Sequence, residues 1–346
     1  MISLLLAIGP VLLFLGTLVA MDSFRLLRPS AVLTAFAWGA VAALIAMPSR
    51  DWLGHIVQIS PEGFTRYAGP PIEEALKGAF VIAQIARRRV GFLIDATILG
   101  FAVGTGFAVV ENLAYLRTLG DSAPPLLWAV RGLGTAVLHG AATAILAMLT
   151  KRATDRSPER TAIVWLPGWL AAASIHSAFN HVPLPAAAQT AVLLVVLPLI
   201  VVFVFQRSER STREWMGAGL DLDVMLLELV ESERFDDTRF GAYLRQLRSR
   251  FPGHVVVDML CLLRIELELS IRAKAFVLAR SAGLAVTGDE DLAACLAERD
   301  YVSKSIGATG RLALKPLRVT SDRDRWHRQL LSGIMRKAGR AARTRS

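Results

Sequence analysis

The chain has 346 residues, of which 53% are hydrophobic, with a mean hydropathy of +0.46 and a formal net charge of +10. Soluble domains are about 45–50% apolar and lack long uncharged runs, whereas the apolar residues here are concentrated in the first 206 positions. This pattern excludes an ordinary soluble enzyme and favours a membrane protein. The basic excess is typical of a cytoplasmic membrane face, and no nucleic-acid-binding motif accompanies it.

Seven apolar segments are long enough to cross a bilayer, which takes about 20 residues. The first lacks the basic flank of a signal peptide, and another follows it closely, so we expect it to be retained as a span. The expected fold class is therefore all-α, a polytopic transmembrane helix bundle. The predicted spans are residues 2–20, 31–48, 69–86, 93–116, 126–149, 162–183 and 186–206.

Basic residues alternate between the connections, which predicts the orientation of the bundle. Arginine or lysine residues follow the first, third, fifth and seventh spans, and the other connections are poorer in positive charge. By the positive-inside rule these four connections are cytoplasmic. The N-terminus is then outside and the C-terminus cytoplasmic, in a multi-pass protein of the lipid bilayer. The residues concerned are Arg25, Arg28, Arg87, Arg88, Arg89, Lys151, Arg152, Arg156, Arg160, Arg207, Arg210 and Arg213.

The composition becomes charged and mixed after the seventh span. Residues 207–317 have helical apolar spacing and predict a small helical cytosolic domain, while residues 318–346 form a basic tail that we expect to be disordered or to lie along the membrane. Cys261 and Cys295 match no metal or disulfide pattern. Helices of this kind can bind a partner or dimerise, and the sequence identifies no partner.

Ionisable residues inside the spans are the feature that most needs an explanation. Each costs about 2.5–3.5 kcal/mol at the centre of a spanning helix. The polar residues of four spans are Glu73, Glu74 and Lys77; Asp95, Glu111 and Asn112; Arg131 and His139; and His176, Asn180 and His181. With the orientation above, most of them come together towards the outer half of the bundle, whereas Asp95 lies near the cytoplasmic end of its span.

Some of these residues also have plain structural explanations. Prolines followed by acids are typical of an ordinary helix start, as at Pro70 and Glu73. Lys77 is expected mainly to neutralise a neighbouring glutamate. Asp95 and Arg131 are as readily structural partners as catalytic groups. Glu111, His139 and His176, within apolar helices, nevertheless indicate a functional site when they are taken together.

Four motifs in this order resemble the PrsW family of membrane proteases, which is related to the type II CAAX-prenyl endopeptidases. They are EEALK from Glu73 to Lys77, FAVVEN from Phe107 to Asn112, LHG around His139, and HSAFN from His176 to Asn180. The resemblance covers roughly residues 65–185. It implies an intramembrane peptidase of the bacterial inner membrane that cuts a membrane protein, and for bacterial members the first cut in a membrane-bound anti-sigma factor during envelope stress.

The resemblance also suggests roles for the site residues. Glu73 is favoured as general base, and Glu74 as the residue that holds the site together through Lys77 or a backbone partner. His176 and Asn180, four residues apart on one helical face, suit oxyanion stabilisation. The water site would be completed by Glu111 and His139, with Lys77, Phe107 and Asn112 in support.

Two questions stay open from the sequence, the presence of a metal and the class of function. Glu74, Glu111, His139 and His176 could also bind a divalent metal such as zinc, although no His-Glu-x-x-His motif is present. We slightly favour a metal-independent glutamate mechanism and assign no cofactor. The alternatives to a peptidase are a proton-coupled transporter or channel that uses the same residues, and a catalytically silent scaffold. A transporter should show internal symmetry, and the sequence has none that we can detect.

Overall fold

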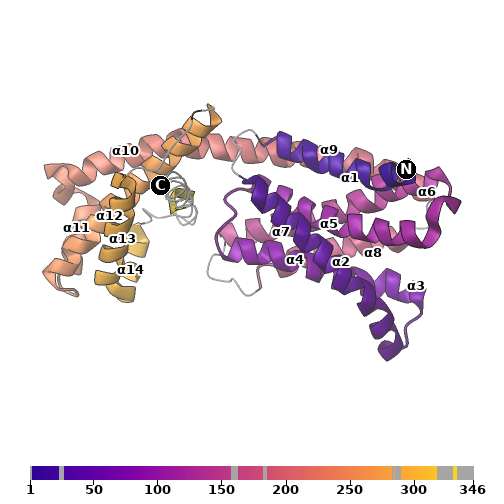
Figure 1. The fold of residues 1–346 in the computed structure, drawn as a ribbon. Helices are drawn as coiled ribbons and strands as arrows, with labels where there is room; N and C mark the ends of the chain where they lie inside the picture. The colour runs from indigo at the N-terminus through magenta and orange to yellow at the C-terminus, as the bar shows by residue number, and fades with distance from the viewer. Residues whose placement is uncertain are drawn as a thin grey trace, which may run out of the picture. The chain divides into compact units, whose positions relative to one another are not determined.

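The computed structural model describes residues 2–22, 27–156, 163–181, 185–282, 284, 290–317 and 330–332, which are helical with short connections and contain no strand. The chain divides into two compact units, Met1–Glu209 and Arg210–Ser346. Each unit is described separately below (Figure 1). The sequence predicts a division after residue 206. Its basic tail, apart from residues 330–332, lies outside the described residues.

The first unit is a bundle of helices, two of which are preceded by a π-helical turn. The turn η1 (Phe64–Ala68) leads into α4, and η3 (Arg131–Thr135) leads from α6 into α7. A short 3₁₀ turn, η2 (Gly120–Ser122), follows α5. The helices are α1 (Ile2–Ala20), α2 (Pro29–Val57), α3 (Pro61–Gly63), α4 (Gly69–Ala86), α5 (Leu93–Leu119), α6 (Pro125–Val130), α7 (Ala136–Arg156), α8 (Leu166–His181) and α9 (Ala186–Met216), whose last seven residues belong to the second unit.

A helical membrane bundle is confirmed, with five helical segments in the described residues long and apolar enough to span. They are Ile2–Ala20, Pro29–Gly54, Leu93–Leu119, Pro125–Arg156 and Ala186–Glu231. Two of the seven predicted spans do not meet these criteria. The helix α4 carries Glu73, Glu74 and Lys77 within 18 residues, and α8 has only 16 residues. These two helices carry much of the polar site.

The central helix α5 is buried along most of its length because glycines allow its neighbours to approach closely (Figure 1). A Cβ atom on Gly104 would lie 2.2 Å from the carbonyl oxygen of His139 in α7. At the contact of α5 with α2, a Cβ on Gly106 would lie 1.9 Å from the carbonyl oxygen of Phe36. Such close packing of small residues is typical of membrane helices. It brings the polar residues of α5 and α7 within reach of each other.

Side chains of α8 hold the segment that leads into α4. The Trp169 indole donates a hydrogen bond to the carbonyl of Pro71 at 2.9 Å. The Ser177 hydroxyl donates to the carbonyl of Arg66 at 2.6 Å, and the Asn180 amide donates to that of Thr65 at 2.9 Å. Thr65 and Arg66 belong to the π-helical turn η1, whose hydrogen bonds run from residue i to i+5, and Ser177 and Asn180 add side-chain donors to two of its carbonyls. The contacts fix the start of α4 against α8.

The second unit contains α10 (Ala218–Glu231), η4 (Glu233–Asp237), α11 (Arg239–Leu247), α12 (Gly253–Ser281), α13 (Glu290–Ser305), α14 (Gly307–Leu314) and η5 (Lys315–Leu317). Its apolar core is centred on α12, where Met259 and Ile265 are almost fully buried and Leu292 of α13 packs into the same cluster. The buried Lys274 pairs with Asp223 at 2.5 Å and ties α12 to α10. Both cysteines are free thiols.

Candidate active site

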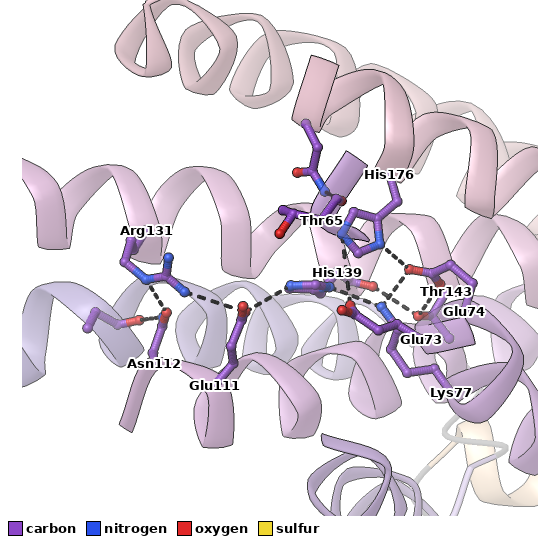
Figure 2. Close-up of polar contacts among 12 residues, drawn as sticks. Thr65, Glu73, Glu74, Lys77, Glu111, Asn112, Arg131, His139, Thr143 and His176 are labelled. Atoms are coloured by element: carbon purple, nitrogen blue, oxygen red, sulfur yellow. Dashed lines mark hydrogen bonds and ion pairs between the residues drawn. The ribbon is translucent and has the colours of Figure 1, made fainter. Parts of the chain in front are cut away.

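Polar side chains from α4, α5, α7 and α8 meet in one cluster within the first unit (Figure 2). Most of these groups are almost completely buried, and Glu74, Lys77, His139 and His176 are at most 4% exposed. Buried polar groups at such depth need partners, because an unpaired charge in an apolar setting is expensive. Each buried polar atom of the cluster is therefore expected to have a hydrogen-bond or ion-pair partner.

The pair of Glu74 and Lys77 is fully buried within the cluster. They lie three residues apart on α4, and the lysine ammonium donates to Oε1 of Glu74 at 2.5 Å. The same oxygen faces Nδ1 of His176 at 3.0 Å. The other oxygen, Oε2, accepts a hydrogen bond from the Thr143 hydroxyl at 3.3 Å. Both oxygens of Glu74 are thus occupied, so this carboxylate orients other groups.

Both ring nitrogens of His139 are also occupied. Its Nδ1 lies 3.0 Å from Nζ of Lys77, and its Nε2 lies 3.0 Å from Oε2 of Glu111. An ammonium group only donates and a carboxylate only accepts, so a neutral His139 must accept at Nδ1 and donate from Nε2. This pairing fixes the tautomer, and the ring also packs against Phe107 at 5.0 Å and His176 at 4.8 Å between centroids.

A second cation supports Glu111 from the other side. The Arg131 guanidinium lies 3.5 Å from Oε2 of Glu111 and donates through Nε to Oδ1 of Asn112 at 2.9 Å. It stacks on the Tyr115 ring at 3.6 Å. The Asn112 amide in turn donates to the carbonyl of Ala7 in α1 at 2.7 Å. Arg131, which has a plain structural explanation in the sequence, thus belongs to the polar cluster.

One carboxylate of the cluster is held loosely. The side chain of Glu73 is 27% exposed, and its Oε2 lies 3.9 Å from Nε2 of His176. Because Nδ1 of His176 faces the carboxylate of Glu74, that nitrogen donates and Nε2 carries the lone pair when the ring is neutral. The facing atoms of Glu73 and His176 are then both acceptors. A proton on one of them, or a third group bound by both, satisfies this arrangement.

The structure brings together all but one of the six residues expected to be catalytic. The exception is Asn180, whose amide donates to the backbone of Thr65. Of the supporting residues, Lys77 and Phe107 touch the cluster directly, with the ammonium 4.6 Å from the ring centroid, while Asn112 joins it through Arg131. Thr143 was not predicted, and its four-residue spacing from His139 is the signal that could have found it.

Asp95, which the sequence leaves open between structural and catalytic roles, lies apart from this cluster. Its Oδ2 accepts hydrogen bonds from the backbone amides of Gly91 and Phe92 at 3.1 and 3.0 Å. A carboxylate that accepts from backbone amides at a helix start satisfies donors that the helix itself leaves unpaired. Asp95 therefore caps the start of α5.

A helix bundle with buried carboxylates, histidines and a lysine defines a multi-pass membrane protein with an acid–base site. A family model described as PrsW family intramembrane metalloprotease matches residues 28–206, slightly more than half of the chain. The chain belongs to this family, which confirms the resemblance drawn from its four motifs, and it is a membrane endopeptidase. Comparison with curated proteins and with solved structures gave no match.

The family description implies a metal, and the donor set fits one with a single reservation. Glu73, His139 and His176 each offer a ligand atom, and these atoms all lie within 4.8 Å of one another. Two imidazoles and a carboxylate form a common catalytic zinc set. The metal candidates Glu74 and Glu111 instead face the histidine rings, as carboxylates that orient metal-bound histidines do. The reservation is His139, whose nitrogens both already have partners.

Proposed function

We propose that the chain hydrolyses peptide bonds of a membrane protein with Glu73 and His176 as the reacting pair. The observation that carries this proposal is the 3.9 Å approach of the Glu73 carboxylate to Nε2 of His176. These two atoms are the loosely held ones in a cluster whose other groups are paired. A carboxylate that is free to exchange protons is suited to general base catalysis.

The reaction follows from the placement of these two groups. The Glu73 carboxylate takes a proton from a water molecule, whose oxygen then bonds to the scissile carbonyl carbon. A protonated His176, held by Glu74 through Nδ1, donates from Nε2 to the resulting oxyanion. Glu73 then returns its proton to the leaving nitrogen as the carbon–nitrogen bond breaks. The water is consumed, and both side chains regain their starting protonation.

The remaining residues position this pair. Lys77 balances the charge of Glu74, and Glu111 orients His139, whose ring packs edge-on against His176. If a divalent metal is present, Glu73 and His176 would hold it, and it would polarise the carbonyl and acidify the water. Asn180 is better explained as an anchor for the turn before α4 than as an oxyanion donor. A transporter is not favoured for a member of a peptidase family.

The test is cleavage of membrane-anchored reporter peptides by the purified full-length protein in lipid. Glu73→Gln and His176→Ala should each abolish cleavage, with and without a chelator. The matched control is Glu62→Gln, because Glu62 is a 71% exposed carboxylate in a surface pair with Arg66. Loss of wild-type cleavage on chelation would assign the metal mechanism. Undiminished cleavage by Glu73→Gln would refute the proposed base.

The finer biological setting is also a proposal. The resemblance supports a bacterial inner-membrane protein that makes the first cut in an anti-sigma factor, and the loop arginines support an N-terminus outside and a C-terminus in the cytoplasm. The second unit would then bind a cytosolic partner or pair with a second copy. Reporter fusions at both termini test the orientation, and co-expression with a tagged anti-sigma factor tests the substrate.

A further inference from the structure

The position of Lys77 sets this site apart from an open metal centre. Its side chain is fully buried, and its ammonium lies 2.5 Å from Oε1 of Glu74 and 3.0 Å from Nδ1 of His139. The Phe107 ring covers it at 4.6 Å. A carboxylate oxygen and an imidazole nitrogen are also the ligand atoms that zinc prefers. The lysine therefore occupies, as a built-in cation, a place between two metal-type ligands.

The two histidines differ in whether a ring nitrogen is available to bind a metal. His176 has one nitrogen on the Glu74 carboxylate and the other free towards Glu73. His139 has Lys77 on one nitrogen and Glu111 on the other (Figure 2). Whichever nitrogen of His139 were to bind a metal, it would have to release a charged partner, either Lys77 or Glu111. Release of Lys77 would leave its ammonium with Glu74 as its remaining acceptor and close to a second cation.

We propose that Lys77 keeps His139 from binding a metal, so that the native site offers a metal only Glu73 and His176. This inference rests on the proposed function for the identity of the site. Lys77 supplies the positive charge beside Glu74 that a metal would otherwise supply, and it holds His139 as an orienting group. Removal of its charge frees Nδ1 of His139, and His139 can then join Glu73 and His176 in a two-histidine, one-carboxylate set.

The experiment measures metal binding by the full-length protein in detergent, at fixed pH, with Co²⁺ as the probe and its visible absorption as the readout. Lys77→Met and Lys77→Gln should lower the Kd for Co²⁺ by about 10- to 100-fold, the range by which partners of metal ligands alter affinity. Lys77→Arg keeps a cation and should show no gain. Lys274→Met is the control for loss of a buried, ion-paired lysine elsewhere.

The gain must also depend on His139. The double variant Lys77→Met/His139→Ala should return to the wild-type Kd. An unchanged Kd in both single variants, or a gain that survives the loss of His139, would overturn the inference. These readouts need no cleavage, so a gain of cobalt affinity in the Lys77 variants together with no cleavage by the wild type would refute the proposed function alone.

A second measurement uses the wild-type protein in case the Lys77 variants do not fold. Histidine labelled with ¹⁵N distinguishes ring nitrogens that carry a proton, a lone pair or a metal. On addition of Zn²⁺ the signals of His176 should shift first, while those of His139 keep a protonated Nε2 and an accepting Nδ1. Simultaneous shifts of both histidines in the first equivalent of zinc would contradict the role of Lys77.

Discussion

Replacement of Gly104 by alanine should separate the two helices that carry Glu111 and His139. A Cβ atom at this position would lie 2.2 Å from the carbonyl oxygen and 2.5 Å from the carbonyl carbon of His139. Real Cβ atoms essentially never come within 3.0 Å of such atoms. The helices α5 and α7 must therefore move apart by about 0.8 Å, because the obstacle is backbone and cannot rotate away.

This displacement predicts two measurable losses. Overpacking of this kind destabilises by about 1–3 kcal/mol, and a misplacement near 1 Å can lower activity by about 100-fold. Peptide cleavage in lipid reports the second effect, and unfolding in mixed detergent reports the first. The larger relative loss should be in kcat, because the shift disturbs Glu111 and His139, which position the reacting pair, and leaves substrate contacts elsewhere intact.

Gly16→Ala in α1 is the matched control, since a Cβ on Gly16 meets no atom within 4 Å. It should match the wild type in activity and be no less stable, because alanine has the higher helix propensity. If Gly104→Ala behaves like Gly16→Ala in both assays, then the close approach of α5 and α7 does not position the site.

Two further substitutions test the charge pairing in the polar cluster, and a pH series tests a buried thiol of the second unit. Glu74→Gln leaves the buried Lys77 without its anion and should destabilise the bundle by about 3–5 kcal/mol in detergent unfolding; a loss below 1 kcal/mol would contradict the pairing. Arg131→Gln removes the cation beside Glu111 and should lower kcat by about 10- to 100-fold with little change in KM, whereas a change in KM alone would argue against it. Burial raises the pKa of the Cys295 thiol to about 11, so its alkylation rate in the folded protein should keep rising with pH towards 11; a plateau near pH 8.5, the value of a free thiol, would refute this.

The sequence predicts the membrane bundle well because the relevant signal is local. Apolar length alone identifies helices such as α1 and α5. The same signal fails by composition at α4, which carries Glu73, Glu74 and Lys77, and by length at α8, which has only 16 residues. Both helices are nevertheless among the spans predicted from the sequence, 69–86 and 162–183, because a mostly apolar segment qualifies as a predicted span even where it holds charged residues. The π-helical turn η3 that joins α6 to α7 was not predicted, because no pattern of residues indicates it.

The site shows where sequence reasoning ends. Helical spacing predicts pairs on one helix, and Lys77 does meet Glu74 three residues away. It does not predict which faces of different helices meet. The contact of Lys77 with His139 joins residues 62 positions apart. Asn180 shares a face with His176 and yet donates to the backbone carbonyl of Thr65, which lies 115 positions away in the π-helical turn η1.

The long-range contacts of Lys77 with His139 and of Glu74 with His176 have a consequence for insertion of the newly made chain. Each charged residue costs about 2.5–3.5 kcal/mol at the centre of an isolated spanning helix, so α4 alone is poorly accepted by the bilayer. The partners that stabilise it are His139 and His176, which are synthesised 62 residues after Lys77 and 102 residues after Glu74. We therefore expect α4 to insert stably only after α7 and α8 have been synthesised. A chain truncated before α7 would keep the charged residues of α4 without these partners, and we expect it to be degraded.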